Sequence, residues 1–316
     1  MSTSAESGPG ATRPTSTGSG TYGFARSFIS ARTEGVLLVL FTACSWGLTW
    51  PQTKYLFGLL PPFSARAVCG ILGCLVAFAV ALVRRERVAP PADQWVRLLV
   101  YAMLNYGLFI VLTTGSLVWL KASEAVTITY TLPVWASLLA WPMLGERPTP
   151  AKLVALVLAL AGVALLVGAD NAEATWEKLP AALMALAAAV LFGLATVLAK
   201  KHPLRLPPAT AVAWQAAFGM IPLLALAATE TRDWGRMTLP GWGAVAYIST
   251  LPMTVAYLAW FRALRLVPAS MAATTVLVSP VVGVIGSSLL LGETFSPRQI
   301  AGLVLTLSGV ALAARG

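Results

Sequence analysis

The chain carries a long apolar stretch twice, at a constant offset of 147 residues and without a gap. Residues 122–167 read ASEAVTITYTLPVWASLLAWPMLGERPTPAKLVALVLALAGVALLV, and residues 269–314 read ASMAATTVLVSPVVGVIGSSLLLGETFSPRQIAGLVLTLSGVALAA. Eighteen of the 46 aligned positions are identical, including Pro133/Pro280, Gly145/Gly292, Glu146/Glu293, Pro150/Pro297 and Gly162/Gly309. Apolar composition explains matches of Leu, Val and Ala but not this shared register. An internal repeat of apolar helices is typical of secondary transporters, whose site lies between the halves.

The repeat continues towards the N-terminus at an offset of 146. There Gly47 aligns with Gly193, Lys54 with Lys200, Pro61-Pro62 with Pro207-Pro208, and Gly73 with Gly219. Two charged residues do not repeat, because Val212 takes the place of Arg66 and Met271 that of Glu124. A symmetric frame around an asymmetric site explains this difference, and neutral drift explains it nearly as well.

The composition is that of a membrane protein. Of the 316 residues, 58% are hydrophobic and 11% are charged, and the mean hydropathy is +0.78. A soluble domain carries about 25% charged residues, so we expect the lipid bilayer to be the main partner of this chain. The net charge of +10 comes from residues spread between apolar runs, and the longest basic cluster is Arg84, Arg85 and Arg87. We therefore expect no nucleic-acid partner.

The apolar runs predict an all-α integral membrane protein with ten transmembrane helices. Each run is long enough to cross a hydrocarbon core of about 30 Å. The runs around 101–118 and 240–262 are the least regular, because both carry Tyr, Thr or Ser in mid-segment. The predicted segments are 34–54, 62–83, 96–118, 122–143, 150–169, 179–200, 208–228, 240–262, 268–291 and 297–314.

We expect three parts: a disordered tail over residues 1–33, rich in Ser, Thr, Gly and Pro, a first five-helix repeat over 34–169, and a second over 179–315. Five is an odd number, so the second repeat enters the membrane inverted relative to the first. With a cytoplasmic N-terminus, 15 of the 22 Lys and Arg residues lie on the cytoplasmic side and six on the other. The positive-inside rule therefore predicts that both termini are cytoplasmic and that the linker 170–178 is external.

The residues resemble the drug/metabolite transporter superfamily, specifically its ten-helix branch built from two EamA-type domains. The resemblance covers about 280 residues, from Glu34 to the end. In the first half it is carried by Trp46-Gly47, Pro61-Pro62, Arg66, Ala122–Pro133, Leu144-Gly145-Glu146 and Gly162-Val163. In the second half it is carried by Ala263-Leu264-Arg265, Pro268-Ala269-Ser270, Pro280, Leu291-Gly292-Glu293 and Gly309-Val310.

The resemblance implies a transporter of small metabolites in the inner membrane, exporting amino acids or related amphipathic compounds. Efflux of drugs or toxic compounds by proton antiport is an alternative. A membrane scaffold or receptor without transport is an alternative of another class, although it would not need a second inverted copy. An enzyme is not expected, since no hydrolase, metalloprotease or phosphate-binding motif occurs. We expect a small-molecule substrate, no cofactor and no metal, and the oligomeric state stays open, a homodimer included.

Polar and aromatic side chains at membrane depth are the candidates for a substrate cavity, because polar groups in a bilayer usually face a cavity or a partner. Each taken singly is better explained by helix packing or by interfacial anchoring. As a set they suit amphipathic, zwitterionic or aromatic solutes. The candidates are Trp46, Thr49, Arg66, Asn105, Tyr106, Thr127, Tyr130, Trp214, Gln215 and Tyr257, with Trp260 beside Tyr257 and with Thr127, Tyr130 and Thr131 expected on one helix face.

Charged candidates are few. Arg66 has three interpretations: snorkelling to the headgroups, pairing with a helix C-terminus, or attracting a substrate carboxylate. Glu124 is the candidate for ion coupling, since it lies within one turn of a helix start. Glu146 and Glu293 each precede a Pro-led helix, and we expect each carboxylate to accept hydrogen bonds from that helix start. A proton-carrying role for these two glutamates is the alternative. Pro133 and Pro280 are expected to loosen the fourth and ninth helices.

Overall fold

The structure is a computed structural model that describes residues 30–167, 172–267, 271–272 and 275–315. Residues 31–316 belong to one compact unit. The expected tail over residues 1–33 lies outside the described residues as far as residue 29, and Ala31–Thr33 already belong to the first helix. Part of the expected external linker is also helical, because α8 begins at Ala172, where alanines and glutamates favour a helix start.

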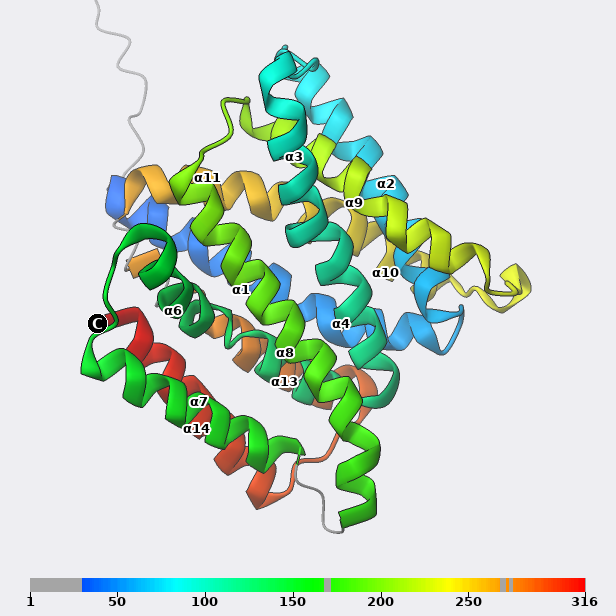
Figure 1. Ribbon diagram of the computed structural model, residues 1–316. Helices are drawn as coiled ribbons and strands as arrows, with labels where there is room; N and C mark the ends of the chain where they lie inside the picture. The colour runs from blue at the N-terminus through cyan, green and yellow to red at the C-terminus, as the bar shows by residue number, and fades with distance from the viewer. Residues whose placement is uncertain (1–29, 168–171, 268–270, 273–274, 316) are drawn as a thin grey trace, which may run out of the picture. The chain divides into compact units, whose positions relative to one another are not determined.

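All the regular elements in the described part of the chain are helices (Figure 1). The first half contains α1 (Ala31–Phe57), α2 (Pro62–Val83), η1 (Ala92–Gln94), α3 (Trp95–Ala102), η2 (Met103–Gly107), α4 (Leu108–Trp119), α5 (Ala122–Thr129), α6 (Leu132–Leu144) and α7 (Pro150–Val167). The second half contains α8 (Ala172–Lys201), α9 (Pro208–Ala228), η3 (Trp234–Arg236), α10 (Leu239–Thr250), η4 (Leu251–Val255), α11 (Ala256–Leu266), α13 (Val278–Leu291) and α14 (Pro297–Arg315).

Six helical stretches in the described residues are long and apolar enough to cross a membrane. Three shorter apolar helices accompany them: Pro150–Leu166, Val278–Leu291 and Pro297–Leu312. The six longer stretches are Ala31–Phe57, Pro62–Val83, Ala92–Trp119, Trp176–Lys201, Pro208–Ala228 and Leu239–Leu266, and each overlaps a segment predicted from the sequence.

The fourth predicted segment is broken near its middle rather than continuous. Helix α5 ends at Thr129 and α6 begins at Leu132, with Tyr130 and Thr131 forming a turn between them. A similar turn at Val276 and Leu277 precedes α13. Each turn lies two to four residues before a repeated proline, Pro133 or Pro280. Proline cannot donate a backbone hydrogen bond and restricts the residue before it, so the breaks lie where the sequence predicted a weakened helix.

Two π-helical turns occur at corresponding places in the two halves. The first, η2, joins α3 to α4, and the second, η4, joins α10 to α11. Both fall in the two segments whose sequence was least regular. A π-helical turn holds one residue more than an α-helical turn and is frequent at functional sites. Pro252 contributes to the second turn, since it has no N–H for the α-helical pattern.

Repeat-related glycines make repeat-related contacts. A Cβ placed on Gly47 of α1 would lie 3.0 Å from Val282 of α13 and 3.1 Å from the backbone nitrogen of Gly283. A Cβ on Gly193 of α8 would lie 3.2 Å from Trp135 of α6 and 2.9 Å from the backbone nitrogen of Ala136. The partners differ by the same offset of 147 residues that relates the halves. Small residues therefore let the first helix of each half press against the broken helix of the other.

The helices that close each half, α7 and α14, lie side by side (Figure 1). A Cβ on Gly162 would lie 2.6 Å from the nitrogen of Thr306, whereas one on Gly309 would lie 2.6 Å from the oxygen of Ala155. The earlier residue of α7, Ala155, thus faces the later residue of α14, Gly309, so the two helices are antiparallel. The second helices, α2 and α9, are antiparallel too, because Phe63 meets Glu230 and Cys74 meets Ala213.

Candidate functional site

Four aromatic rings from both halves form one cluster at the middle of the bundle. The ring of Trp46, in α1, lies 5.2 Å from that of Tyr257 and 5.9 Å from that of Trp260, both in α11. Tyr257 also stacks on Tyr106 of η2, with ring centroids 5.8 Å apart. Aromatic pairs at these separations stabilise one another beyond their buried area. The structure thus brings together Trp46, Tyr106 and Tyr257, three of the candidates for the substrate cavity.

The π-helical turns position this aromatic cluster. The indole Nε1 of Trp46 donates a hydrogen bond of 3.1 Å to the Pro252 carbonyl in η4. Tyr106 lies in η2, where Gly219 of α9 comes so close that an added Cβ would lie 2.9 Å from the nitrogen of Gly107. The repeat partner of Gly219, Gly73 of α2, approaches Met253 of η4 in the same way. Each half thus places its second helix against the π-helical turn of the other.

Asn105 and Gln215 also meet across the halves. The amide Nδ2 of Asn105 donates a hydrogen bond of 3.1 Å to Oε1 of Gln215, whose Nε2 donates to the Ala211 carbonyl at 3.2 Å. Both side chains are half-buried. An amide pair offers donors and acceptors without a charge. Asn105 directly precedes Tyr106 in η2, so the amide pair adjoins the aromatic cluster along the chain.

Three hydroxyl groups near these elements are buried without a hydrogen-bond partner among the described residues. They belong to Tyr106, Thr114 of α4 and Thr129 at the end of α5. Tyr106 is 5% exposed, and the two threonines are fully buried. An unsatisfied buried hydroxyl costs free energy unless water or a ligand satisfies it. No hydrogen bond to a described residue satisfies these three hydroxyls.

Several candidates lie outside the aromatic cluster. Trp214 packs on Phe78 and Trp95, and its Nε1 donates to the Val88 carbonyl at 2.8 Å, so it holds the loop after α2. Arg66 donates from Nη1 to the Thr53 hydroxyl at 3.1 Å, which ties α2 to α1. Thr49 bonds back to the Ser45 carbonyl within its own helix. The sequence could not give the direction of these side chains.

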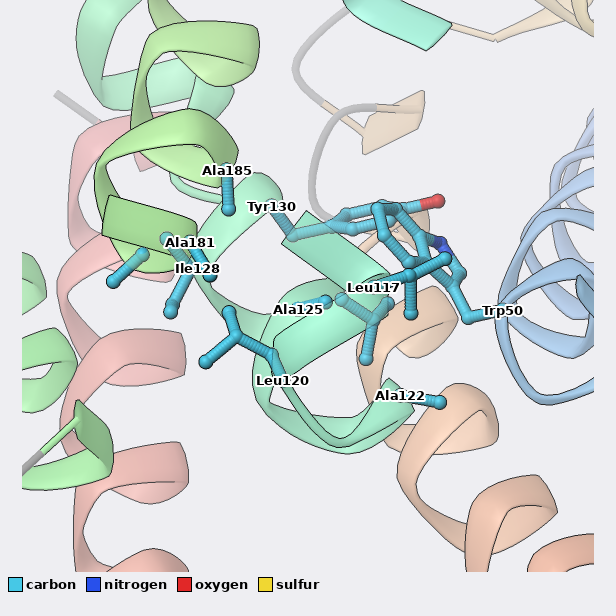
Figure 2. Packing of buried hydrophobic residues seen from close by; sticks show 11 residues of the cluster. Trp50, Leu117, Leu120, Ala122, Ala125, Ile128, Tyr130, Ala181 and Ala185 are labelled. Atoms are coloured by element: carbon cyan, nitrogen blue, oxygen red, sulfur yellow. The ribbon is translucent and has the colours of Figure 1, made fainter. Parts of the chain in front are cut away.

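The expectation that Thr127, Tyr130 and Thr131 share one helix face is wrong, because the helix breaks at Tyr130. Thr127 stays within α5, bonds back to the Ser123 carbonyl at 2.8 Å and borders a small cavity against α14. Tyr130 instead packs in an apolar cluster that includes Trp50 (Figure 2). The hydroxyl of Thr131 receives a hydrogen bond of 3.1 Å from Trp135.

Glu124 is 1% exposed and held by three partners. Its Oε1 pairs with the ammonium of Lys178 at 2.8 Å and accepts from the Gln299 amide at 3.1 Å, while its Oε2 accepts from the Lys121 backbone N–H at 3.0 Å. A buried carboxylate persists where charge pairing and hydrogen bonds satisfy it. The sequence identified Glu124 but did not anticipate Lys178 as its partner.

The sequence predicted that each of the two repeated glutamates caps the helix that follows it. This prediction is wrong. Glu293 accepts hydrogen bonds from the backbone N–H of Ala122 at 2.8 Å and of Ser123 at 3.3 Å, so it caps α5 instead of α14. Glu146 forms an ion pair of 2.5 Å with Lys200. The cause is the preceding glycine: Gly145 and Gly292 adopt φ of 76° and 65°, a left-handed end that redirects the chain.

No group of three or more His, Cys, Asp or Glu residues placed to hold a metal ion occurs within the described ranges. The three cysteines, Cys44, Cys69 and Cys74, carry free thiols. The polar groups of the candidate site are amides, hydroxyls and an indole N–H. Such groups bind solutes through hydrogen bonds and ring contacts.

Long apolar helices arranged as two matching halves define a multi-pass membrane transporter. The profile of the EamA-like transporter family matches residues 33–168 and again residues 179–315. The chain belongs to the EamA-like transporter family.

Relatives and solved structures agree with this assignment. The uncharacterized transporter YvbV of Bacillus subtilis is 29% identical over 282 residues, covering 89% of this chain and 92% of the relative. An uncharacterized transporter of Archaeoglobus fulgidus is 24% identical over 283 residues, covering 88% of this chain and 98% of the relative. A chain of known crystal structure matches with a TM-score of 0.63 at 22% identity, covering 88% of this chain and 96% of that one. The last similarity shows a shared fold.

Proposed function

We infer that this protein exports amino acids or related amphipathic, zwitterionic compounds across the inner membrane by alternating access. The observation that carries the proposal is the composition of the interface between the halves. Trp46 and Asn105 of the first half meet Tyr257 and Gln215 of the second. Rings and uncharged amides from both halves suit a solute with an apolar part and several hydrogen-bonding groups.

The same proposal includes ten membrane crossings in two inverted repeats of five helices, with both termini in the cytoplasm. Its support is that the repeat-related helices α7 and α14 run antiparallel, which is the relationship expected between inverted copies. Ion pairs add support, since they join segment ends that this topology places on one side. Examples are Glu34 with Arg262 and Asp93 with Arg205, which fall on the cytoplasmic side of the proposal.

The broken helices and the π-helical turns support a solute site at the middle of the bundle. Discontinuous helices in transporters place free backbone groups and flexible joints near the substrate. Here both π-helical turns contribute to the aromatic cluster, because η2 contains Tyr106 and the Pro252 carbonyl of η4 accepts a hydrogen bond from Trp46. The break at Tyr130 packs with Trp50, which lies one helical turn along α1 from Trp46. The unpartnered hydroxyl of Tyr106 adds a hydrogen-bonding group to this region.

The test is a solute screen by counterflow with purified full-length protein in liposomes. Labelled amino acids with apolar side chains are expected to exchange, whereas sugars and nucleotides are not. Asn105→Ala and Tyr257→Ala are expected to lower exchange at least about tenfold, as loss of binding contacts of about 1.4 kcal/mol would. Gly243→Ala is the matched control, because an added Cβ there meets nothing within 4 Å. Undiminished exchange in both cavity variants would place the solute elsewhere, and exchange of no zwitterionic solute would refute the proposed substrate class.

A further inference from the structure

A cluster of charged residues joins the two halves at the end of the bundle where α5 begins. The turn between α4 and α5, around Leu120 and Lys121, lies at its centre. Groups from α1, α8, the loop after α13 and α14 all bind this turn or the first residues of α5. We call Lys54, Lys121, Glu124, Lys178 and Glu293 the charged latch.

Glu293 makes the strongest connection in the charged latch. Its two oxygens accept from the backbone N–H groups of Ala122 and Ser123, and the Ser123 hydroxyl donates to Oε2 at 2.5 Å. These N–H groups belong to the first turn of α5 and have no partner inside that helix. A carboxylate at this position also benefits from the positive end of the helix. The second half thus supplies the cap for a helix of the first half.

Lys54 binds the other side of the same turn. Its ammonium donates to the carbonyls of Leu117 and of Leu120, at the end of α4, with a distance of 3.0 Å to the latter. Those carbonyls carry the negative end of the helix, which a cation stabilises. Lys121 returns a contact by donating from Nζ to the Thr294 carbonyl at 3.1 Å. The end of α4 and the start of α5 are therefore both held by charges.

Beneath the charged latch an apolar cluster continues the closure towards the middle of the bundle. We call it the apolar plug, and Figure 2 shows how its side chains converge between the helices. Its members are buried and come from α1, α4, α5 and α8, with Tyr130 at the helix break. The apolar plug consists of Trp50, Leu117, Leu120, Ala122, Ala125, Val126, Ile128, Tyr130, Ala181, Ala182 and Ala185.

The repeat-related residues at the opposite end make a different arrangement. Lys200 is the counterpart of Lys54, and Glu146 is the counterpart of Glu293. They pair with each other at 2.5 Å, and their side chains are 65% and 48% exposed. Glu293 and Lys54 instead bind the backbone of the first half. The repeat-related residues thus make an exposed ion pair at one end, whereas at the other end Glu293 binds the backbone across the halves and Lys54 binds the backbone within the first half.

We propose that the charged latch is the gate that holds this end of the transport pathway closed, and that release of Glu293 from the start of α5 opens it. The proposal rests on alternating access in the function inferred above. Helix α5 of the first half is capped by Glu293 of the second half, and it loses this cap when the halves separate at this end. Capping of α5 and closure of the pathway therefore occur together. A cavity of about 40 Å³ lies between α5 and α14, bordered by Ser123 and Gln299.

The experiment measures access to the apolar plug without requiring a known solute. Ala125, which is fully buried, is replaced by Cys in a variant lacking Cys44, Cys69 and Cys74. The purified full-length protein in detergent is treated with a charged maleimide, and the labelling rate is measured. Glu293→Ala is expected to raise the rate at least about tenfold by shifting the population towards the open state. Glu146→Ala, the repeat-related control, is expected to leave it within about twofold.

Two further variants keep the outcome decisive. Glu293→Gln keeps an oxygen for the Ala122 N–H but removes the charge, so it is expected to give an intermediate rate. Lys54→Met is expected to raise the rate as well, and both variants serve if Glu293→Ala does not fold. An unchanged rate in Glu293→Gln and Lys54→Met, or an equal rise in Glu146→Ala, overturns the charged latch. Labelling as expected with no transported solute would instead refute the proposed function and leave the gate standing.

Discussion

Asn105 and Gln215 lie 110 positions apart in the chain and share a hydrogen bond of 3.1 Å. The first belongs to a π-helical turn of one half and the second to α9 of the other. Removing one partner leaves a half-buried amide oxygen or N–H unsatisfied, whereas removing both does not. This bond is therefore a sensitive probe of how the halves fit together.

We expect Asn105→Leu to lower the stability of the purified protein by about 1–2 kcal/mol, and Gln215→Leu to do the same. The double variant is expected to lose less than the sum, because no amide is left without its partner. Thermal unfolding of the detergent-solubilised protein measures all three. Strict additivity would show that the two amides do not interact.

Tyr106→Phe should be nearly neutral or slightly stabilising, since it keeps the ring stacked on Tyr257 and removes a buried hydroxyl that lacks a partner. Tyr106→Ala should cost about 3–4 kcal/mol, because it leaves a cavity in the aromatic cluster. Unfolding in detergent gives both values. A loss of more than about 2 kcal/mol in Tyr106→Phe would mean that the hydroxyl has a partner such as an ordered water.

Gly162→Ala is expected to destabilise the protein by about 1–3 kcal/mol through overpacking against α14. An added Cβ would lie 2.6 Å from the nitrogen and closer still to the hydroxyl of Thr306. Gly243→Ala makes the same change in an exposed helical position with nothing within 4 Å, so it should be neutral or stabilising. Equal effects of the two substitutions would mean that α7 and α14 are not in close contact.

The proposed topology predicts opposite reactivity for two exposed sites. In a background without native cysteines, Thr231→Cys should react with an impermeant thiol reagent in intact cells, whereas Lys201→Cys should react only after the membrane is opened. Asn171, in the predicted external linker, lies outside the described residues. The reverse pattern would invert the orientation and with it the distribution of Lys and Arg.

A pH gradient should not drive uphill transport through Glu124. Its carboxylate pairs with Lys178 and binds Gln299, so it is engaged in structure at the end of the bundle. In proteoliposomes with an imposed pH gradient, we expect the solute to reach equal concentrations on both sides. Accumulation that depends on the gradient and is abolished by Glu124→Gln would make Glu124 the proton carrier and favour antiport.

The sequence predicted the parts of the fold that follow from composition and register. Apolar runs gave the helices, and the matched Gly47 and Gly193 marked real close contacts. The repeated prolines marked the broken helix before Pro133. These features are local or repeated, and each has one dominant physical cause, namely burial in lipid, the missing Cβ of glycine or the missing N–H of proline.

The sequence did not predict which groups meet across the halves. Trp214 and Tyr257 were both candidates for the substrate cavity. In the structure Trp214 binds the loop after α2, whereas Tyr257 packs on Trp46. Glu293 was expected to cap its own following helix, but a left-handed glycine turned it towards α5. The direction of a side chain depends on which helices pack against its own, and a single sequence does not reveal that packing.

The π-helical turns have a consequence for how the faces of two helices are read. Each residue in an α-helix advances the direction of its side chain by about 100°, so the additional residue in η2 rotates all of α4 relative to α3. A single helical wheel drawn through Ala92–Trp119 would therefore assign the lipid-facing side of one part to the buried side of the other. Deleting one residue within Met103–Gly107 would rotate Thr113 and Ser116, both buried, by about 100° away from their present neighbours. The same deletion in an exposed loop would change no face at all.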